Sequence, residues 1–218
     1  MFGTTVVVSS HLDDAVFSCG ALINAMQVTT NVLVVTVCAG VPEPNVMAAP
    51  LDVSAGFESA AQAVEARRLE DISALTVLGA KHLHLDVLDY QYERHLRVGD
   101  KHDLARYERL RQEQINHALA PVFAAASQVI APLGIRHPDH KMVATASKPY
   151  AAWVYEDLPY RVEWPDQMPG MPPVTFKMPC TEAKLIAVRR YWSQLQGQPG
   201  WQLKVSERYH AGIANQRR

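Results

Sequence analysis

The chain has 218 residues, of which 48% are hydrophobic and 20% are charged, with a formal net charge of -1. This composition is typical of a globular protein large enough for one sizeable core, and it offers no basic excess for contacts with nucleic-acid phosphates. No apolar run approaches the length of a membrane span, and no Lys or Arg precedes Arg67, so the start of the chain lacks the charged segment of a signal peptide.

The three cysteines are Cys19, Cys38 and Cys180, and they are widely spaced. They form no Cys-x-x-Cys pair and indicate no disulfide framework. We therefore expect a reduced, cytoplasmic protein that has neither nucleic acid nor a membrane as a partner.

Short β-branched runs alternate with segments of helical periodicity along most of the chain. A stretch rich in Pro, Ala and Gly, 39–56, interrupts the pattern and predicts a long loop, which in a compact domain is usually functional or mobile. In chain order, the pattern predicts strand 4–9, helix 14–26, strand 32–37, helix 60–78 ending at Gly79, strand 82–88, helix 103–123, strand 127–131, a helix reaching 147, a strand starting at 153 and helix 181–196.

Strands that alternate with helices in this way predict an α/β domain with a mostly parallel sheet and helices on both faces. We expect residues 1–218 to form a single domain, in which residues 159–218 are a less regular C-terminal elaboration. Ligands of such sheets bind beyond the carboxyl ends of the strands. Polar residues that directly follow predicted strands are therefore the first candidates for a site.

The first such segment is His11-Leu12-Asp13-Asp14, which comes directly after strand 4–9. Taken alone, it is well explained by helix capping, because either aspartate could accept a hydrogen bond at the start of the next helix and interact favourably with its positive end. No glycine-rich turn follows the strand, so the dinucleotide-binding fingerprint is absent.

The second segment is His137-Pro138-Asp139-His140, which follows a late strand. Taken alone, it is explained by a surface turn, since Pro-Asp is a common turn pair. In a parallel sheet, however, both segments emerge at the same edge, although they lie far apart in the chain.

Together the two segments contain a set of metal ligands. Two histidines and one carboxylate are typical of hydrolytic zinc sites, which keep a position open for water and substrate. His11, Asp14 and His140 supply this set. The same donors also suit Fe²⁺, Co²⁺ or Ni²⁺.

The remaining polar residues of the two segments can then serve the chemistry. Asp13 lies beside the metal position, where a carboxylate can take a proton from the attacking water. As an imidazolium, His137 could stabilise an oxyanion or protonate a leaving amine. Asp139 could orient one of the imidazole rings that bind the metal.

The segments HLDDA and HPDH resemble the two motifs of the zinc-dependent PIG-L/LmbE-like N-deacetylases, His-Pro-Asp-Asp-Glu and His-x-Asp-His. The resemblance extends to about residue 160 and includes GALI, VVTVCAG and RRLEDISALTVLGA, while VYEDLPY and YWSQ resemble a bacterial subgroup that acts in small-molecule biosynthesis. It implies a Rossmann-like three-layer α/β/α sandwich and hydrolysis of an N-acyl group, usually the acetyl group of an amino sugar.

The same resemblance implies roles for individual residues. Leu12 replaces the usual Pro and Ala15 the usual Glu, and because neither position is a metal ligand in the family pattern, we expect altered surroundings rather than lost chemistry. The family's metal ligands correspond to His11, Asp14 and His140, its general base to Asp13, and its transition-state stabiliser to His137.

Three further residues are candidates for substrate contact. Arg67 matches a family arginine that faces the substrate, although a solvated helix charge would explain it too. Asp89 follows the third predicted strand and could bind a substrate hydroxyl. Tyr155 lies at the end of another predicted strand, where a substrate contact and a structural role are both open.

The sequence therefore predicts a zinc-dependent hydrolase that removes an N-acyl group from a small molecule such as an amino sugar. One alternative is a metal-dependent amidase for a thiol conjugate or a peptide-like precursor. Another is a non-catalytic metal-binding module of the same fold. We expect segments 39–56 and 159–180 to form the pocket. Members of the family often associate, which leaves a homo-oligomer open.

Overall fold

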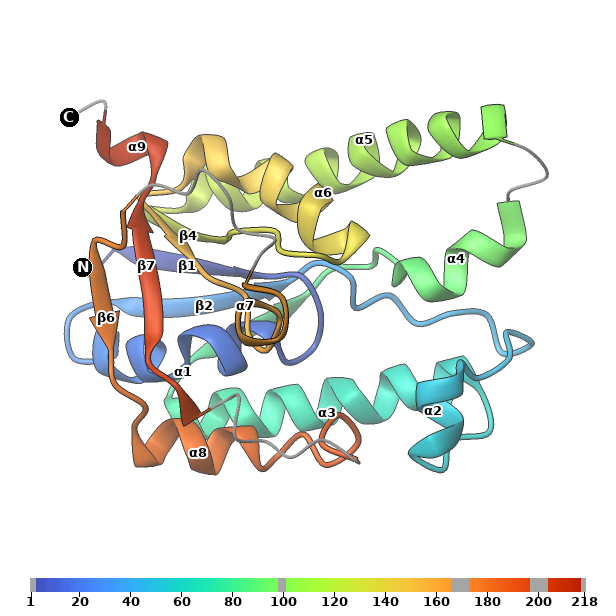
Figure 1. Ribbon diagram of the computed structural model, residues 1–218, viewed down its shortest axis with the longest axis horizontal. Coiled ribbons are helices and arrows are strands. Elements are labelled where there is room, and N and C mark those ends of the chain that lie inside the picture. The colour runs from blue at the N-terminus through green and yellow to red at the C-terminus, as the bar shows by residue number, and fades with distance from the viewer. Residues whose placement is uncertain (1–2, 98–100, 166–172, 197–203, 217–218) are drawn as a thin grey trace.

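The computed structural model describes residues 3–97, 101–165, 173–196 and 204–216, and it places helices on both faces of one sheet (Figure 1). The strands are β1 (Thr4–Ser9), β2 (Asn31–Thr36), β3 (Lys81–His84), β4 (Gln128–Pro132), β5 (Trp153–Tyr155), β6 (Phe176–Met178) and β7 (Glu207–Ala211). The helices are α1 (Asp14–Met26), α2 (Pro50–Ser54), α3 (Ala60–Leu78), α4 (Tyr90–Arg97), α5 (Lys101–Ala125), α6 (Pro138–Ser147), α7 (Tyr160–Glu163), α8 (Glu182–Val188) and α9 (Ile213–Gln216), with a 3-10 turn at Lys148–Tyr150.

The described strands form a seven-stranded sheet in the order β3-β2-β1-β4-β5-β7-β6. Strands β1 to β5 pair in parallel, whereas β7 pairs antiparallel with both β5 and β6. The sequence prediction of a mostly parallel sheet is confirmed. Because β1 lies inside this sheet, its Val6, Val7 and Val8 are all buried, which explains the unbroken β-branched run.

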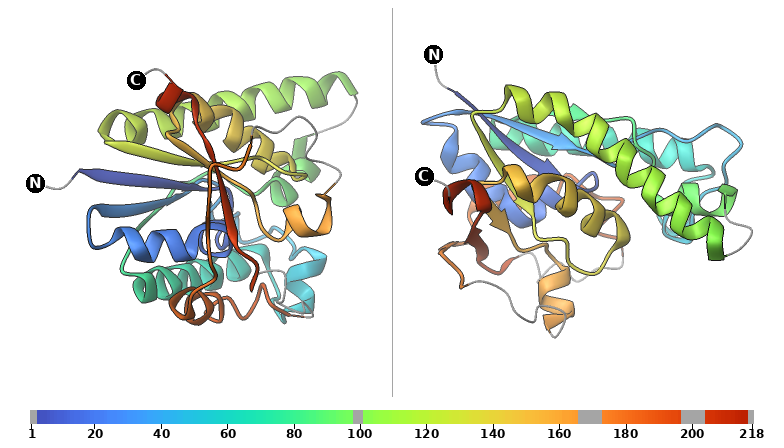
Figure 2. Two further views of the ribbon diagram at one scale, coloured as in Figure 1. Left: turned by 60° about the vertical axis from the view of Figure 1, so that its left-hand side comes forward. Right: turned by 90° about the horizontal axis from the view of Figure 1, so that it is seen from above.

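Helices cover both faces of the sheet (Figure 2), and a hydrophobic core lies between the sheet and the helices on each face. On one face, Val7 of β1 packs in a cluster with Leu75 of α3 and Val188 of α8. On the other face, Val8 packs in a cluster with Leu119 of α5. The result is the three-layer α/β/α sandwich that the sequence resemblance implies.

The early part of the fold follows the sequence prediction closely. Strand 4–9 and helices 14–26 and 60–78 are found with the predicted ends. Gly79 ends α3 in the left-handed conformation, at φ 77°, where a residue without a Cβ avoids strain. Between α1 and α3, the predicted loop 39–56 contains the short helix α2.

Two other predicted segments need correction. Strand 82–88 is shorter, because β3 ends at His84, and the chain then forms α4, a helix that the sequence reading did not predict. The predicted helix 181–196 is also shorter, since α8 ends at Val188. Among the described residues, no helix is both long and apolar enough to cross a membrane.

Residues 159–218, which we expected to form a less regular C-terminal elaboration, contribute β6 and β7 to the main sheet. The hydrophobic pattern does not predict β7, because two of its buried positions carry polar side chains: Glu207 pairs with Lys184, and His210 pairs with Glu156. Part of the Pro-rich stretch, 166–172, and part of the C-terminal tail, 197–203, lie outside the described residues.

Candidate metal centre

The start of α1 is organised by a serine rather than by the aspartates. The Ser9 hydroxyl donates to the His11 carbonyl at 2.7 Å and accepts from the Ala15 amide at 3.0 Å. Asp13 occupies the N-cap position but makes no side-chain capping hydrogen bond. Asp14 instead accepts a hydrogen bond from the His11 amide at 2.8 Å. The capping explanation is therefore wrong for Asp13, whose carboxylate accepts no capping hydrogen bond at the start of α1.

The start of α6 is set by a tight turn after β4. Gly134 adopts φ 87°, and a Cβ on this residue would lie 2.7 Å from the Cβ of Ala144, so the close approach of the turn to α6 requires glycine. His137 is the N-cap of α6, and its Nδ1 accepts a hydrogen bond from the Asp139 amide at 3.2 Å. This acceptor role leaves the proton of a neutral His137 ring on Nε2.

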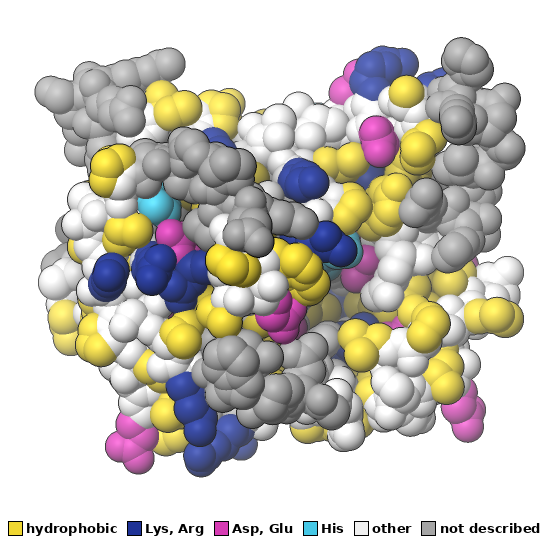
Figure 3. All heavy atoms as spheres, viewed as in Figure 1, with side chains coloured by type: hydrophobic (Ala, Val, Ile, Leu, Met, Phe, Trp, Pro, Cys, Tyr) yellow, Lys and Arg dark blue, Asp and Glu magenta, His cyan; other side chains and the backbone are white. Residues whose placement is uncertain are grey.

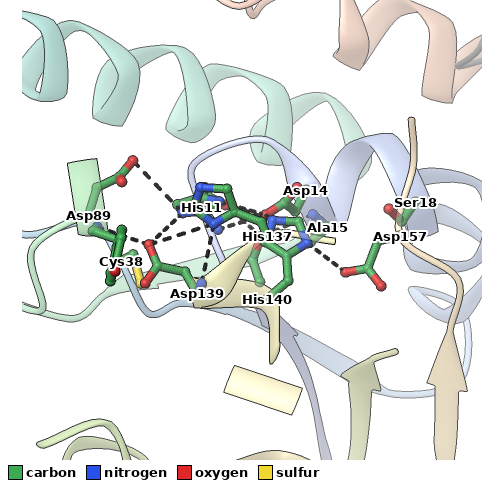
Figure 4. Close-up of polar contacts among 12 residues, drawn as sticks. His11, Asp14, Ala15, Ser18, Cys38, Asp89, His137, Asp139, His140 and Asp157 are labelled. Atoms are coloured by element: carbon green, nitrogen blue, oxygen red, sulfur yellow. Dashed lines mark hydrogen bonds and ion pairs between the residues drawn. The ribbon is translucent and has the colours of Figure 1, made fainter. Parts of the chain in front are cut away.

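The two sequence motifs meet at the carboxyl edge of the sheet, as the parallel topology predicts (Figure 4). Nδ1 of His11 lies 3.1 Å from Nε2 of His140 and 3.3 Å from Oδ2 of Asp14. The triangle closes with 3.0 Å between Oδ2 of Asp14 and Nε2 of His140. Tetrahedral zinc, at about 2.1 Å from each ligand, keeps its ligands about 3.4 Å apart. Three donor atoms at these separations fit a divalent metal ion.

Carboxylates on the far side of each imidazole support this fit. Nε2 of His11 is 3.0 Å from Oδ2 of Asp139, and Nδ1 of His140 is 2.9 Å from Oδ1 of Asp157. Each carboxylate accepts an imidazole N–H and so leaves the other ring nitrogen, the one in the triangle, as a lone-pair donor. Metal-binding histidines in proteins are commonly held in this way.

The charges of the site favour the ionised form of Asp14. Burial alone would raise the pKa of this carboxyl group, but the neighbouring imidazoles of His140 and His11 outweigh burial and hold the pKa well below its usual range. Burial likewise opposes a proton on His140, yet Asp14 and Asp157 raise its pKa to about 9. The site is therefore rich in negative charge and suited to a cation.

The pKa values of Asp13 and His137, the two residues assigned to chemistry, shift in the opposite directions to those of Asp14 and His140. Burial, followed by the negative charge of Asp14, raises the pKa of Asp13 well above its usual value. Burial, followed by the charge of His11, lowers the pKa of His137 to about 4. These directions favour a neutral His137 ring at pH 7 and so count against the imidazolium expected from sequence. The ligand nitrogens of His11, His137 and His140 all lie within 4.8 Å of one another, so His137 borders the metal position.

The substrate candidates differ in their placement. Asp89 lies at the site, with Oδ2 at 3.8 Å from Nε2 of His11. Arg67 is only 5% exposed and pairs with Asp52 at 2.7 Å, which excludes the reading of a solvated helix charge. The positive charge of Arg67 also lowers the pKa of Asp13, against the larger effect of burial.

Tyr155 is placed in the core rather than at the surface of the site. Its side chain is fully buried, and its hydroxyl donates to the carbonyl of Val8 at 2.8 Å. The prediction that Tyr155 contacts substrate is therefore not supported, because its hydroxyl already donates a hydrogen bond to the backbone of β1.

Sequence reasoning did not single out Arg111, and for Asp157 it left a structural role and a role at the site equally open. Asp157 follows β5 directly, which is the same signal that identified His11 after β1. Arg111 interrupts an otherwise apolar stripe of α5, and its guanidinium donates to Asp139 at 2.7 Å. A charged residue at an i, i+4 position of an apolar helix face is the signal that could have identified it.

A cavity of about 640 Å³ lies between the 39–56 segment and the start of α4. Its apolar lining includes Val46, Met47 and Pro50 from the 39–56 segment. Gln91 also lines it and donates a hydrogen bond to Asp89, the residue that faces His11. The space-filling view shows the molecule hollowed in this region, with histidine and acidic side chains visible in the hollow (Figure 3).

Comparisons with known proteins agree with this geometry. Residues 6–151 match the family described as GlcNAc-PI de-N-acetylase, PIG-L. No curated protein matches the chain. The zinc-inhibited form of teicoplanin deacetylase is 25% identical, with 94% of this chain and 96% of that chain covered and a TM-score of 0.72. An antimicrobial pseudoaglycone deacetylase is 26% identical, with 95% and 96% covered and a TM-score of 0.70. The N,N'-diacetylchitobiose deacetylase of Pyrococcus horikoshii is 16% identical, with 96% and 83% covered, and shares the fold at a TM-score of 0.62.

Proposed function

Because the chain belongs to the GlcNAc-PI de-N-acetylase (PIG-L) family, we propose that it is a metal-dependent hydrolase that removes an N-acyl group, in the first place acetyl, from a small molecule. The observation that carries the proposal is the triangle of donor atoms from His11, Asp14 and His140, with sides of 3.0 to 3.3 Å. Zinc is the metal we propose, and Fe²⁺, Co²⁺ and Ni²⁺ suit the same donors.

Two residues beside the triangle, Asp13 and His137, have separate roles in the proposed hydrolysis. When bound, the metal supplies a Lewis acid that polarises the acyl carbonyl and lowers the pKa of water. Asp13 takes the proton of the attacking water, which its raised pKa favours, and returns it to the departing amine. His137 donates a hydrogen bond from Nε2 to the oxyanion, because its Nδ1 is occupied by the Asp139 amide.

The remainder of the substrate extends from the metal centre along two surfaces. On one side, the apolar cavity at 43–50 can receive a hydrophobic portion. On the other, the Tyr160 ring packs against His140 at 4.8 Å and stacks with Trp164 at 5.9 Å. Aromatic faces of this kind suit the apolar face of a sugar ring. We therefore propose an amino sugar that carries an apolar group, such as an intermediate of small-molecule biosynthesis.

A deacylation screen tests this function. Metal-loaded protein is incubated with N-acetylated amino sugars, thiol conjugates and peptide-like amides, and released amine is measured by fluorescence. We expect amine release from amino sugars and none from protein stripped by a chelator. Release from the thiol conjugates or peptide-like amides alone would favour the amidase. Metal binding without turnover of any member would favour the non-catalytic module.

A further inference from the structure

Helix α5 buries an arginine in the middle of an apolar stripe. The stripe faces the sheet and consists of Tyr107, Arg111, Ile115, Leu119 and Phe123, all buried. The side chain of Arg111 has no exposed surface. Burying a guanidinium is costly, and a well-packed apolar residue at such a position often stabilises a protein as well or better. Stability alone therefore does not account for an arginine here.

The Arg111 guanidinium holds one oxygen of Asp139. Its Nε and Nη2 donate to Oδ1 of Asp139 at 3.1 and 2.7 Å. Nη2 also donates to the carbonyl of Leu88 at 2.6 Å, and Nη1 pairs with Glu93. The guanidinium thus joins α5 to the start of α6 and to the segment that carries Asp89.

The second oxygen of Asp139 holds His11. Oδ2 of Asp139 lies 3.0 Å from Nε2 of His11 and accepts a hydrogen bond from the Tyr90 amide at 3.0 Å. With both oxygens fixed, the carboxylate of Asp139 cannot rotate without breaking a buried hydrogen bond. The ring of His11 is then oriented with Nδ1 toward Asp14 and His140.

We propose that Arg111 is a positioning residue of the metal centre, which acts through Asp139 to fix the ring of His11. The inference rests on the metal site proposed above. Lysine cannot replace Arg111 in this role, because an ammonium group is a single point donor and cannot reach Asp139, Leu88 and Glu93 together. Groups that hold metal-binding histidines typically contribute 10- to 100-fold, in rough terms, to metal affinity.

Metal affinity, measured by competition with a chromophoric chelator, and the visible spectrum of the Co²⁺ form test this proposal. We expect Arg111→Met to weaken binding by about 10- to 100-fold and to alter the Co²⁺ spectrum. Arg111→Lys keeps the buried charge and should weaken binding nearly as much. The matched control is Lys184→Met, which removes another fully buried cation, paired with Glu207 at 3.0 Å. It should lower the unfolding midpoint and leave both metal readouts unchanged.

A double-mutant cycle separates positioning from general destabilisation. In an Asp139→Asn background, Arg111→Met should have little further effect on affinity, because its route to His11 is already broken. A folded Arg111→Met protein with wild-type affinity and spectrum, or an effect that persists undiminished without Asp139, would overturn the inference. If Arg111→Met does not fold, Arg111→Lys is read by the same criteria. Wild-type protein that binds no metal would instead overturn the metal centre itself, together with this inference.

Discussion

Asp157 accepts a hydrogen bond from Nδ1 of His140 at 2.9 Å, and neither side chain has exposed surface. The other oxygen of Asp157 accepts from the amides of Gly134 and Ile135 at 2.9 and 3.2 Å. The carboxylate therefore joins the end of β5 both to the proposed metal ligand His140 and to the turn that precedes α6. Residues that follow β4 and β5 are joined at one carboxylate.

This arrangement predicts the effect of Asp157→Asn. An amide cannot accept on both sides, so its NH₂ group must face either the two backbone amides or the N–H of His140. We expect roughly 10- to 100-fold weaker metal binding, measured by chelator competition, and a lower unfolding midpoint. The matched control is Asp71→Asn, since Asp71 pairs with the imidazole of His84 at 2.8 Å and neither residue belongs to the donor triangle. Loss of affinity in both variants would show that the effect is only destabilisation.

The aspartate pair predicts a separation of metal binding from turnover. Asp13→Ala should retain the metal, because its side chain is not part of the donor triangle, and should lose activity by about 10²- to 10⁴-fold. His140→Ala should lose the metal, because it removes one corner of the triangle. Metal content by elemental analysis and the rate of amine release are measured on the same samples. Metal loss in Asp13→Ala would contradict these assignments.

The sequence predicted the parts of this centre that follow buried parallel strands. His11 and His140 could be brought together because a parallel sheet aligns the carboxyl ends of its strands, whatever their separation in the chain. The parts that could not be predicted depend on partners. The apolar stripe of α5 marks Arg111 as buried but does not identify its partner, Asp139. In β7, nothing local marks Glu207 as buried until Lys184 is placed against it. Strand β7 was missed for this reason.

The histidines predict a pH dependence of metal binding. Metal binds neutral imidazole, yet the neighbouring carboxylates raise the pKa of His140 to about 9 despite its burial. Against the effect of burial, Asp89, Asp139 and Asp14 likewise raise the pKa of His11 well above its usual value. Apoprotein prepared by chelation should therefore release protons from both His140 and His11 on binding metal at pH 7, and its apparent affinity should rise between about pH 6 and about pH 8. Calorimetry in two buffers of different ionisation enthalpy measures the proton count.

The raised pKa of His140 also predicts how the free energy of unfolding of the apoprotein depends on pH. The folded pKa of His140 is above the unfolded value of about 6.5, so its contribution is fully present below that pH. It is lost as the pH rises through about 9. Chemical unfolding of apoprotein should show this loss, and the loss should be smaller in His140→Ala, where only His11 keeps a raised pKa in the donor triangle. Metal binding without proton release at pH 7 would contradict the charge state assigned to His140.

The last prediction concerns Arg67, whose charge lowers the pKa of Asp13 against the larger effect of burial. Removing this charge in Arg67→Met should raise the pKa of Asp13 further. Since Asp13 must be ionised to take a proton, the acid limb of kcat/KM should move to higher pH. The control is Arg68→Met, which removes the neighbouring cation, whose Nε donates to the carbonyl of Ala39 at 2.7 Å. An acid limb that moves equally in both variants would indicate a change in overall charge, and one that moves in neither would separate Arg67 from the base.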